Sequence, residues 1–337
     1  RREQLGAVMD SSELFSPSTG KRVPTGSLNV ARQGHSATLL LDGRVMVAGG
    51  GDAGGTTFFG SVEFYDPIAG TWSLSDCPLP DPLAFHTASR LADGTVLFVG
   101  GQTTAPRQQA WRFDPEADCE DAWTADPLPE SRFAHTATVL PSGEVLVIGG
   151  FVDGADPGDV SASVLRYRPD LTAHWSAPMA NLGVARVDHT ATLLPDGRVL
   201  VAGGFNGSAH QASAEIYDPA ANGGQGATAT TGLMPHARAG HSATLMPDGK
   251  LLVAGGYNAL DEELDAVDLY TPASGTWQGL SPLELHQARR GHTATLLHNG
   301  SLLLVGGEPL AGASLEESFP YLLDGWETKA SLAVGRT

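Results

Sequence analysis

Six histidines recur along the chain at steps of 49 to 54 residues, and they carry the first chemical possibility. They are His35, His86, His135, His189, His241 and His292. Imidazole is the commonest metal ligand in proteins, so histidines that converge on one axis could hold a metal ion. A histidine at the head of every copy of a repeat is also what a structural requirement predicts. We favour this second interpretation, a hydrogen bond from each ring to the adjacent repeat.

An arginine stands three residues before five of these histidines. The five are Arg32, Arg132, Arg186, Arg238 and Arg289, and Leu83 takes the place in the remaining copy. A guanidinium can bind an acidic group through two parallel hydrogen bonds, so these arginines could recognise an acidic ligand. In an acidic protein they could instead pair with carboxylates of neighbouring repeats, and we favour that alternative.

The elements that position these residues are six copies of one phrase, such as HTATLLPDGRVLVAGG at 189–204. Each copy holds two short apolar runs rich in Val, Leu and Thr. The runs are separated by a turn pair, which is Asp42-Gly43, Asp93-Gly94, Ser142-Gly143, Asp196-Gly197, Asp248-Gly249 or Asn299-Gly300. Such pairs accept the positive φ of tight hairpin turns, so each copy predicts a β-hairpin. Gly-Gly ends the second run, where a side chain would obstruct a turn or a close backbone approach.

A second half follows each hairpin and completes a unit of four strands. A variable loop leads to a phrase such as VEFYDP at 62–67, and an outer strand then carries Trp72, Trp123, Trp175, Trp277 or Trp326. The unit that starts at His189 lacks this tryptophan, so we expect a looser outer edge there. Residues 1–31 align with a second half alone, and the run 334–337 is similar to the residues that precede a hairpin. We therefore expect further chain or a partner chain to complete a seventh unit.

The Gly-Gly after an apolar strand, the aromatic residue two positions before Pro and the later Trp resemble Kelch repeats, in the form common in bacterial secreted proteins. A period near fifty residues is also typical of repeat architectures. The resemblance implies an all-β fold, a β-propeller whose blades are four-stranded repeats. We expect residues 1–337 to form a single propeller domain, with residues 1–31 as the outer half of a closing blade. Seven blades are preferred, and six are the alternative.

Composition limits the partners and the location of the chain. The net charge of −18 argues against nucleic acid and anionic membrane surfaces, because both attract basic proteins. No apolar run approaches 18 residues, so we expect no membrane insertion. A secreted, cell-surface or periplasmic location is expected. Cys77 and Cys119 are expected to lie toward opposite ends of neighbouring strands, beyond the reach of a disulfide.

Candidate binding residues lie where the repeats differ. The positions after Gly-Gly include Gln102, Phe151, Phe205-Asn206, Tyr257-Asn258 and Glu308. The family resemblance places this loop on the face where Kelch propellers bind ligands. Phe85 and Asp188 replace the Gly or Ala that otherwise precedes the histidine, and Arg186 and Arg238 would lie behind the loops. Aromatic faces beside amides suit a protein, peptide or carbohydrate ligand. The alternative is that the aromatic rings only pack over the rim of the sheets.

Cofactor and enzyme signals are weak. Asp153, Asp156 and Asp159 could hold Ca²⁺ through oxygen ligands, although a solvated acidic turn is the simpler interpretation and no cofactor is expected. Some Kelch propellers are copper radical oxidases that need a Cys-Tyr cross-link and a Tyr-His pair, and no Tyr here adjoins a His. We expect a non-catalytic recognition module. The alternative is a carbohydrate-active enzyme such as an acidic-sugar epimerase (a mutarotase), with an arginine, Asp188 and Glu308 around its pocket.

Overall fold

The computed structural model describes residues 8–103, 107–152, 157–176, 180–281, 283–307, 316–319 and 327–328. In these ranges the chain is built of short β-strands, apart from the 3₁₀ turn η1 (Pro157–Asp159) and the single-turn helix α1 (Ala221–Gly224). Among the same residues no helix is long and apolar enough to cross a bilayer. The all-β expectation is confirmed.

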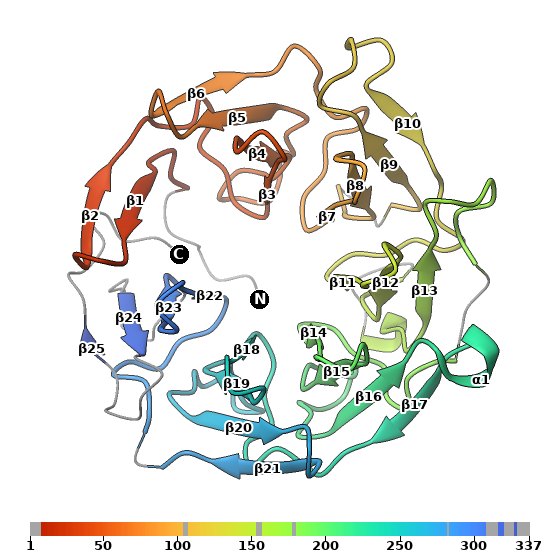
Figure 1. The fold of residues 1–337 in the computed structure, drawn as a ribbon, viewed down its shortest axis with the longest axis vertical. Helices are drawn as coiled ribbons and strands as arrows, with labels where there is room; N and C mark the ends of the chain where they lie inside the picture. Colours follow the sequence, from red (N-terminus) through yellow and green to blue (C-terminus); the bar gives the residue numbers. More distant parts are fainter. Residues whose placement is uncertain are drawn as a thin grey trace. The chain divides into compact units, whose positions relative to one another are not determined.

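Each repeat forms one antiparallel sheet whose strands lie side by side in chain order (Figure 1). The first sheet holds β3 (Ser36–Leu39), β4 (Val45–Ala48), β5 (Val62–Asp66) and β6 (Thr71–Leu74). The second holds β7 (Thr87–Arg90), β8 (Val96–Val99), β9 (Ala110–Phe113) and β10 (Trp123–Ala125), and the third holds β11 (Thr136–Val139), β12 (Val145–Ile148) and β13 (Val164–Tyr167). The fourth holds β14 (Thr190–Leu193), β15 (Val199–Ala202), β16 (Ala214–Asp218) and β17 (Ala227–Thr230).

The fifth sheet holds β18 (Ser242–Leu245), β19 (Leu251–Ala254), β20 (Val267–Thr271) and β21 (Thr276–Gly279). The sixth holds β22 (Thr293–Leu296), β23 (Leu302–Val305), β24 (Glu316–Phe319) and β25 (Glu327–Thr328). Residues near the N-terminus form a separate two-stranded sheet, β1 (Glu13–Ser16) with β2 (Lys21–Pro24). The chain divides into two compact units: unit 1 is mostly residues 22–159 with 165–177, and unit 2 is mostly residues 178–337.

The predicted hairpins form in the expected register. In the fourth repeat Thr190 pairs with Ala202 and Leu193 with Val199, and the turn between them contains Gly197 at φ +86°. All four residues of β15 are 0% exposed. A strand that is buried on both faces reads as a continuous apolar run, which explains the sequence VLVA.

The histidine and Gly-Gly motifs are parts of one packing device between repeats. A Cβ on Gly203 would lie 2.5 Å from the Cε1 atom of His241 in the next repeat, and a Cβ on Gly204 would lie 2.6 Å from the Val187 carbonyl oxygen. Both glycines also have positive φ. No other residue type meets both conditions without displacing its neighbours.

The histidine rings also bond to the preceding repeat. Nε2 of His241 lies 3.0 Å from the Thr190 hydroxyl, and the same contact joins His86 to Ser36, His135 to Thr87 and His292 to Ser242 at 2.8 to 2.9 Å. Burial lowers the pKa of His86 and of His292 to about 3, so these rings are neutral at pH 7. The structure therefore gives the histidines the fold role that the repeat pattern predicts.

The arginines before the histidines are buried inside their own sheets. Arg238 is 0% exposed, and it donates to the carbonyl oxygens of Gly255 and Ala266 at 2.8 and 2.9 Å and to Asp268 at 2.7 Å. Gly255 follows β19 and Ala266 precedes β20, and the Ala266 carbonyl also accepts a hydrogen bond from the Gly255 amide at 3.2 Å. Arg32 with Glu63 and Arg186 with Glu215 repeat this arrangement. In these three repeats the carboxylate comes from the third strand of the same repeat, not from a neighbouring repeat as expected, whereas Arg132 pairs with Glu130, two residues before it.

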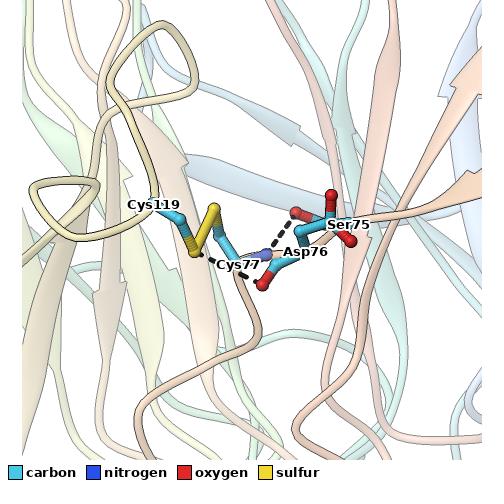
Figure 2. Close-up of a disulfide and its surroundings, with 4 residues drawn as sticks. All are labelled: Ser75, Asp76, Cys77 and Cys119. Carbon is cyan, nitrogen blue, oxygen red and sulfur yellow. Dashed lines mark hydrogen bonds between the residues drawn. A yellow bond between two sulfur atoms is a disulfide. The ribbon is translucent and has the colours of Figure 1, made fainter.

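The two cysteines form a disulfide, so the expectation that they lie too far apart is wrong. Their Cα atoms are 5.1 Å apart (Figure 2). Cys77 lies three residues beyond β6, where the chain has left its own sheet, and it packs against a core cluster to which the next sheet contributes Phe98 and Phe113. Cys119 lies in the loop between β9 and β10, and its Sγ is 3.3 Å from the Asp76 carbonyl oxygen. The sequence argument failed because it placed Cys77 at the end of a strand rather than on this crossing segment.

Candidate functional site

The loops that follow Gly-Gly gather several chemically distinct side chains in unit 2. Phe205 forms a backbone bridge with His210, and Tyr257 forms the equivalent bridge with Glu263. Each loop therefore turns back past its own aromatic residue. We call the resulting group the unit 2 loop cluster, and it consists of Asp188, Phe205, His210, Tyr257, Glu263 and Arg290.

Aromatic and cationic groups form a row through this cluster. The ring centroids of Phe205 and His210 are 5.3 Å apart, and those of His210 and Tyr257 are 4.9 Å apart in an edge-on arrangement. Cζ of Arg290 lies 5.0 Å from the centroid of the Tyr257 ring. This is the geometry of a cation–π contact. The row joins residues of three successive repeats, and all four side chains are only partly buried.

Asp188 approaches the row from an unusual backbone conformation. Its φ is +51°, at a position that Gly240 and Gly291 occupy in the next two repeats with φ of +62° and +64°. The Gly240 amide donates to the Asp188 carbonyl at 2.9 Å, and the Gly291 amide donates to the Gly240 carbonyl at 2.9 Å. These hydrogen bonds between successive repeats hold the left-handed backbone conformation at this position whether the residue is glycine or aspartate. The Asp188 side chain is exposed, and its Oδ2 accepts a hydrogen bond of 3.3 Å from the Tyr257 hydroxyl.

The surroundings shift the titration of the cluster. The nearby protein displaces water and raises the pKa of Asp188, although the side chain still reaches solvent, and the Tyr257 hydrogen bond opposes this shift. Burial, followed by the negative charge of Asp188, raises the pKa of Tyr257. Burial lowers the pKa of His210. Each of these three shifts favours the uncharged form of the group.

Arg290 is the cation of the cluster. Its Nη1 lies 2.6 Å from Oδ1 of Asp261, and its Nε lies 3.7 Å from Oε1 of Glu263. Asp261 has a side chain that is 75% exposed, whereas the side chain of Glu263 is only 8% exposed. Oε2 of Glu263 is buried and has no hydrogen-bond partner among the described residues.

The two predicted asparagines shape their own loops. Oδ1 of Asn206 accepts from the Ser208 and Ala209 amides at 2.9 and 2.8 Å. Oδ1 of Asn258 accepts from the Leu260 and Glu262 amides, and its Nδ2 donates to Glu262 at 3.0 Å. These are local turns of the kind that Asn favours. The amide oxygens therefore hold the loops in which Phe205 and Tyr257 lie.

The predicted residues of unit 1 have separate surroundings. Phe151 stacks on Phe133 with ring centroids 5.0 Å apart, and Gln102 is buried. Phe85, at φ +56°, is 41% exposed and its ring covers Gly34, where a Cβ would lie 3.1 Å from the ring. Asp159 ends η1. Asp153, Asp156 and Glu308 lie outside the described residues, while Arg186 and Arg238 lie buried within unit 2 at 0% exposure.

Sequence reasoning missed three members of the loop cluster. Arg290 had a readable signal, because the same position holds Gln33, Ala84, Phe133, Val187 and Ala239 in the other repeats and Arg290 is the single charged residue among the six. His210 and Glu263 had none. They follow their aromatic partners by five and six residues respectively, so the loops do not align by sequence and only the backbone bridges identify the equivalence.

Comparisons with known proteins identify the repeat. Residues 86–307 match the family model described as the KLHDC2/KLHL20/DRC7 Kelch-repeats domain. The spermatocyte protein spe-26 of Caenorhabditis elegans is 27% identical over 212 residues, which is 60% of this chain and 34% of that protein. The chain thus spans about a third of the length of this curated relative.

Two solved structures share the fold. A structure described as a novel fungal alcohol oxidase of the AA5 family in complex with copper has a TM-score of 0.72 at 17% identity, over 94% of this chain and 67% of that one. The structure of YjhT has a TM-score of 0.66 at 16% identity, over 91% of this chain and 99% of that one. At such identities the likeness concerns the fold alone.

The fold and these matches define a repeat protein of the β-propeller class. The chain belongs to the Kelch repeat family, whose domains are protein-interaction scaffolds. Because one structural relative holds copper, we asked whether a comparable centre fits here. Cys77 and Cys119 are bonded to each other, so neither offers a thiol for a Cys-Tyr cross-link. Over the described ranges, no three His, Cys, Asp or Glu side chains gather as metal ligands would. The described residues therefore do not fit a copper centre of that kind.

Proposed function

We propose that this Kelch domain is a non-catalytic recognition module that binds a protein, peptide or carbohydrate through its post-Gly-Gly loops. The observation that carries the proposal is the contrast between strand and loop residues. The second strand of each hairpin and the arginine that precedes most of the histidines recur with the repeat and are mostly buried, whereas the unit 2 loop cluster differs from repeat to repeat and remains partly exposed. Recognition residues commonly lie on loops that a rigid scaffold positions.

The cluster has the composition of a binding surface. Phe205 and Tyr257 supply aromatic area, Arg290 supplies a cation, and Leu260, three residues after Tyr257, is 76% exposed. Aromatic residues and arginine are enriched at the centres of protein interfaces. The exposed leucine, followed by Asp261, adds apolar area to the same loop.

A glycan and peptide binding screen on the full chain, repeated with F205A and Y257A, tests the proposal. We expect each substitution to weaken binding of a hit by about 1 to 3 kcal/mol, because aromatic contact area is lost. The matched control is L233A, since Leu233 is 68% exposed but follows β17 at the outer edge of its sheet. It should leave binding unchanged. A large fall in melting temperature with unaltered binding in F205A and Y257A would assign both rings to packing instead.

The alternative function is a carbohydrate-active enzyme such as an acidic-sugar epimerase. The observation in its favour is the hydrogen bond between Tyr257 and Asp188, which pairs two titratable groups at an accessible surface. Proton NMR of any sugar that binds separates the two functions. Binding without chemical change supports the recognition module, and conversion between epimers refutes it.

We also propose a secreted or cell-surface location, and a seventh blade for which β1 and β2 are the outer half. The disulfide supports the location, because such bonds persist in oxidising compartments. Contacts of the N-terminal residues support the blade. The Trp72 indole donates to Ser12 at 2.9 Å, just as the Trp277 indole donates to Thr231 of the preceding repeat at 3.2 Å. Ser12, Thr25 and Gly26 therefore contact the first repeat as a preceding blade would.

A further inference from the structure

We infer that the unit 2 loop cluster recognises a positively charged side chain, arginine or lysine, in a peptide segment of the partner protein. This inference rests on the proposed recognition function and names the chemistry of its ligand. The cluster offers more carboxylate than it neutralises, it contains a buried oxygen without a donor, and it already holds one guanidinium in a geometry that a ligand could repeat.

The charge balance of the loops favours a cation. These loops carry Asp188, Asp261, Glu262 and Glu263 but a single arginine, Arg290, and burial favours the neutral form of His210. Arg290 pairs closely with Asp261, at 2.6 Å, and Glu262 accepts from Asn258. Within the described part of the chain, the Tyr257 hydroxyl is the one donor to the Asp188 side chain. An anionic ligand would meet this surplus of negative charge, and the net charge of −18 on the whole chain adds to the repulsion.

Glu263 shows independently that donors are lacking here. Its side chain is 8% exposed, yet Oε2 has no hydrogen-bond partner among the described residues, and Oε1 lies 3.7 Å from Arg290. A buried carboxylate oxygen without a donor is costly. An ammonium group brings three donors and a guanidinium five, so either could serve several oxygens of the cluster at once.

The remaining surface suits the body of a long basic side chain. Arg290 lies over the Tyr257 ring, so an aromatic ring already stabilises a cation at this place. Phe205 offers a second ring, and exposed Leu260 offers apolar contact. Lysine and arginine combine an aliphatic stem with a charged end, which matches an apolar edge beside carboxylates.

The test uses four blocked peptides, acetyl-Gly-Ala-Xaa-Ala-Gly-amide with Xaa as Arg, Lys, Gln or Glu, and the full chain labelled with ¹⁵N. The amide signals of Gly240 and Tyr257 are followed up to about 20 mM peptide, a range that detects millimolar affinity. We expect saturable shifts with the Arg and Lys peptides. Binding should be about tenfold weaker with Gln, absent with Glu, and weaker at high salt.

Two variants assign the effect to the cluster. D188N keeps the shape of the side chain and removes its charge, and it should weaken the Arg peptide about tenfold. E120Q removes one exposed charge outside the cluster and should change nothing. Equal binding of the Arg and Gln peptides, wild-type affinity in D188N, a preference for the Glu peptide, or no shift with any peptide would each overturn the inference.

These outcomes are separable from failure of the proposed function. If hits of the glycan and peptide screen depend on Phe205 and Tyr257 but not on Asp188 or on ligand charge, the recognition module stands and the cationic ligand is wrong. If no hit depends on the aromatic residues, the proposed function itself fails.

Discussion

Two arginines of unit 2 show how this repeat protein divides structure from recognition. Arg238 is 0% exposed and its guanidinium satisfies two backbone carbonyls and Asp268. Arg290 has a side chain that is 29% exposed, lies over Tyr257 and pairs with the exposed Asp261. Both residues are arginines beside carboxylates, yet one is enclosed within a sheet and the other lies on a loop surface.

Their distribution along the chain explains the difference. The position of Arg238 holds arginine in five of six repeats, and each of these arginines donates to the carbonyl of the first glycine of its Gly-Gly pair. The position of Arg290 holds arginine once. A residue that recurs with the repeat is thus explained by packing. A residue that departs from the repeat at an accessible place needs another explanation, and the loop cluster provides it.

The largest expected effect is on the buried arginine. R238A should lower the free energy of unfolding by about 3 to 5 kcal/mol, because Asp268 would remain buried without its cation. R290A should cost less than about 1 kcal/mol, since exposed ion pairs contribute little. Urea denaturation of both variants measures the difference.

A double variant sharpens this result. R238L with D268L removes both charges, so it should cost less than the sum of the two single changes. Equal losses in R238A and R290A would show that burial does not separate the two arginines, and the distinction between scaffold and loop would fail.

An intermediate effect concerns pH. The folded-state pKa is about 4 for His35 and about 3 for His86 and His292, below the ordinary value near 6.5. The unfolded chain therefore binds more protons below pH 6.5, and stability is lost as the pH falls from about 6.5 toward 3. Between pH 6.5 and 4.5 each such ring should lower the free energy of unfolding by about 2 kcal/mol. Urea midpoints over this range should fall steadily.

The loop histidine is the control for this pH dependence. H86Q should flatten the slope, whereas H210Q should leave most of it, because His210 is only partly buried. Carboxylates with a lowered pKa, such as Asp52 at about 2, lose their stabilising effect only at lower pH, so their titration does not overlap the range from pH 6.5 to 4.5. A slope that is unchanged in H86Q would assign acid sensitivity to groups outside the repeat scaffold.

Most of the fold could be predicted from sequence because the same residue pattern occurs in six repeats. The Asp-Gly turns, the buried VLVA runs and the Gly-Gly pairs each have one local physical cause, so the hairpins form as expected. The one repeat that lacks the buried arginine also lacks a carboxylate on its third strand. Where Leu83 replaces the arginine, Trp111 stands where Glu63 stands in the first repeat, so both members of the buried pair are absent together.

The features that sequence could not predict depend on segments without a repeat. Cys77 reaches Cys119 because an irregular stretch crosses to the next sheet. β17 pairs with β16 over four residues although its repeat lacks the tryptophan, so the looser edge expected there is not observed. Phe205, Tyr257 and Asp188 can be found from the sequence because they depart from the residue types of the other repeats. His210 and Glu263 cannot be found in this way, because their loops have different lengths and only tertiary pairing brings them beside the aromatic rings.

The smallest expected effect tests the strained position of the loop cluster. Asp188 and Ala134 both have φ of +51° at a position that is glycine in three of the other repeats and Phe85 in the fourth, and only Asp188 also carries a charge. A134G should stabilise the protein by about 0.5 to 1 kcal/mol through relief of backbone strain. D188G relieves similar strain and also removes a carboxylate whose pKa is raised, so its gain at pH 7 should be at least as large.

The pH dependence separates the two causes. A group with a raised folded-state pKa destabilises the fold at high pH, and this penalty disappears as the pH falls below its ordinary value near 3.8. Any excess gain of D188G over A134G should therefore be present at pH 7 and vanish near pH 3.5, as thermal unfolding at the two values would show. D188G should at the same time lose affinity for the Arg peptide while A134G retains it. A variant that is more stable but binds more weakly would mean that Asp188 is kept for recognition at a cost to the scaffold, and a D188G variant that is less stable than the wild type would assign the residue to packing.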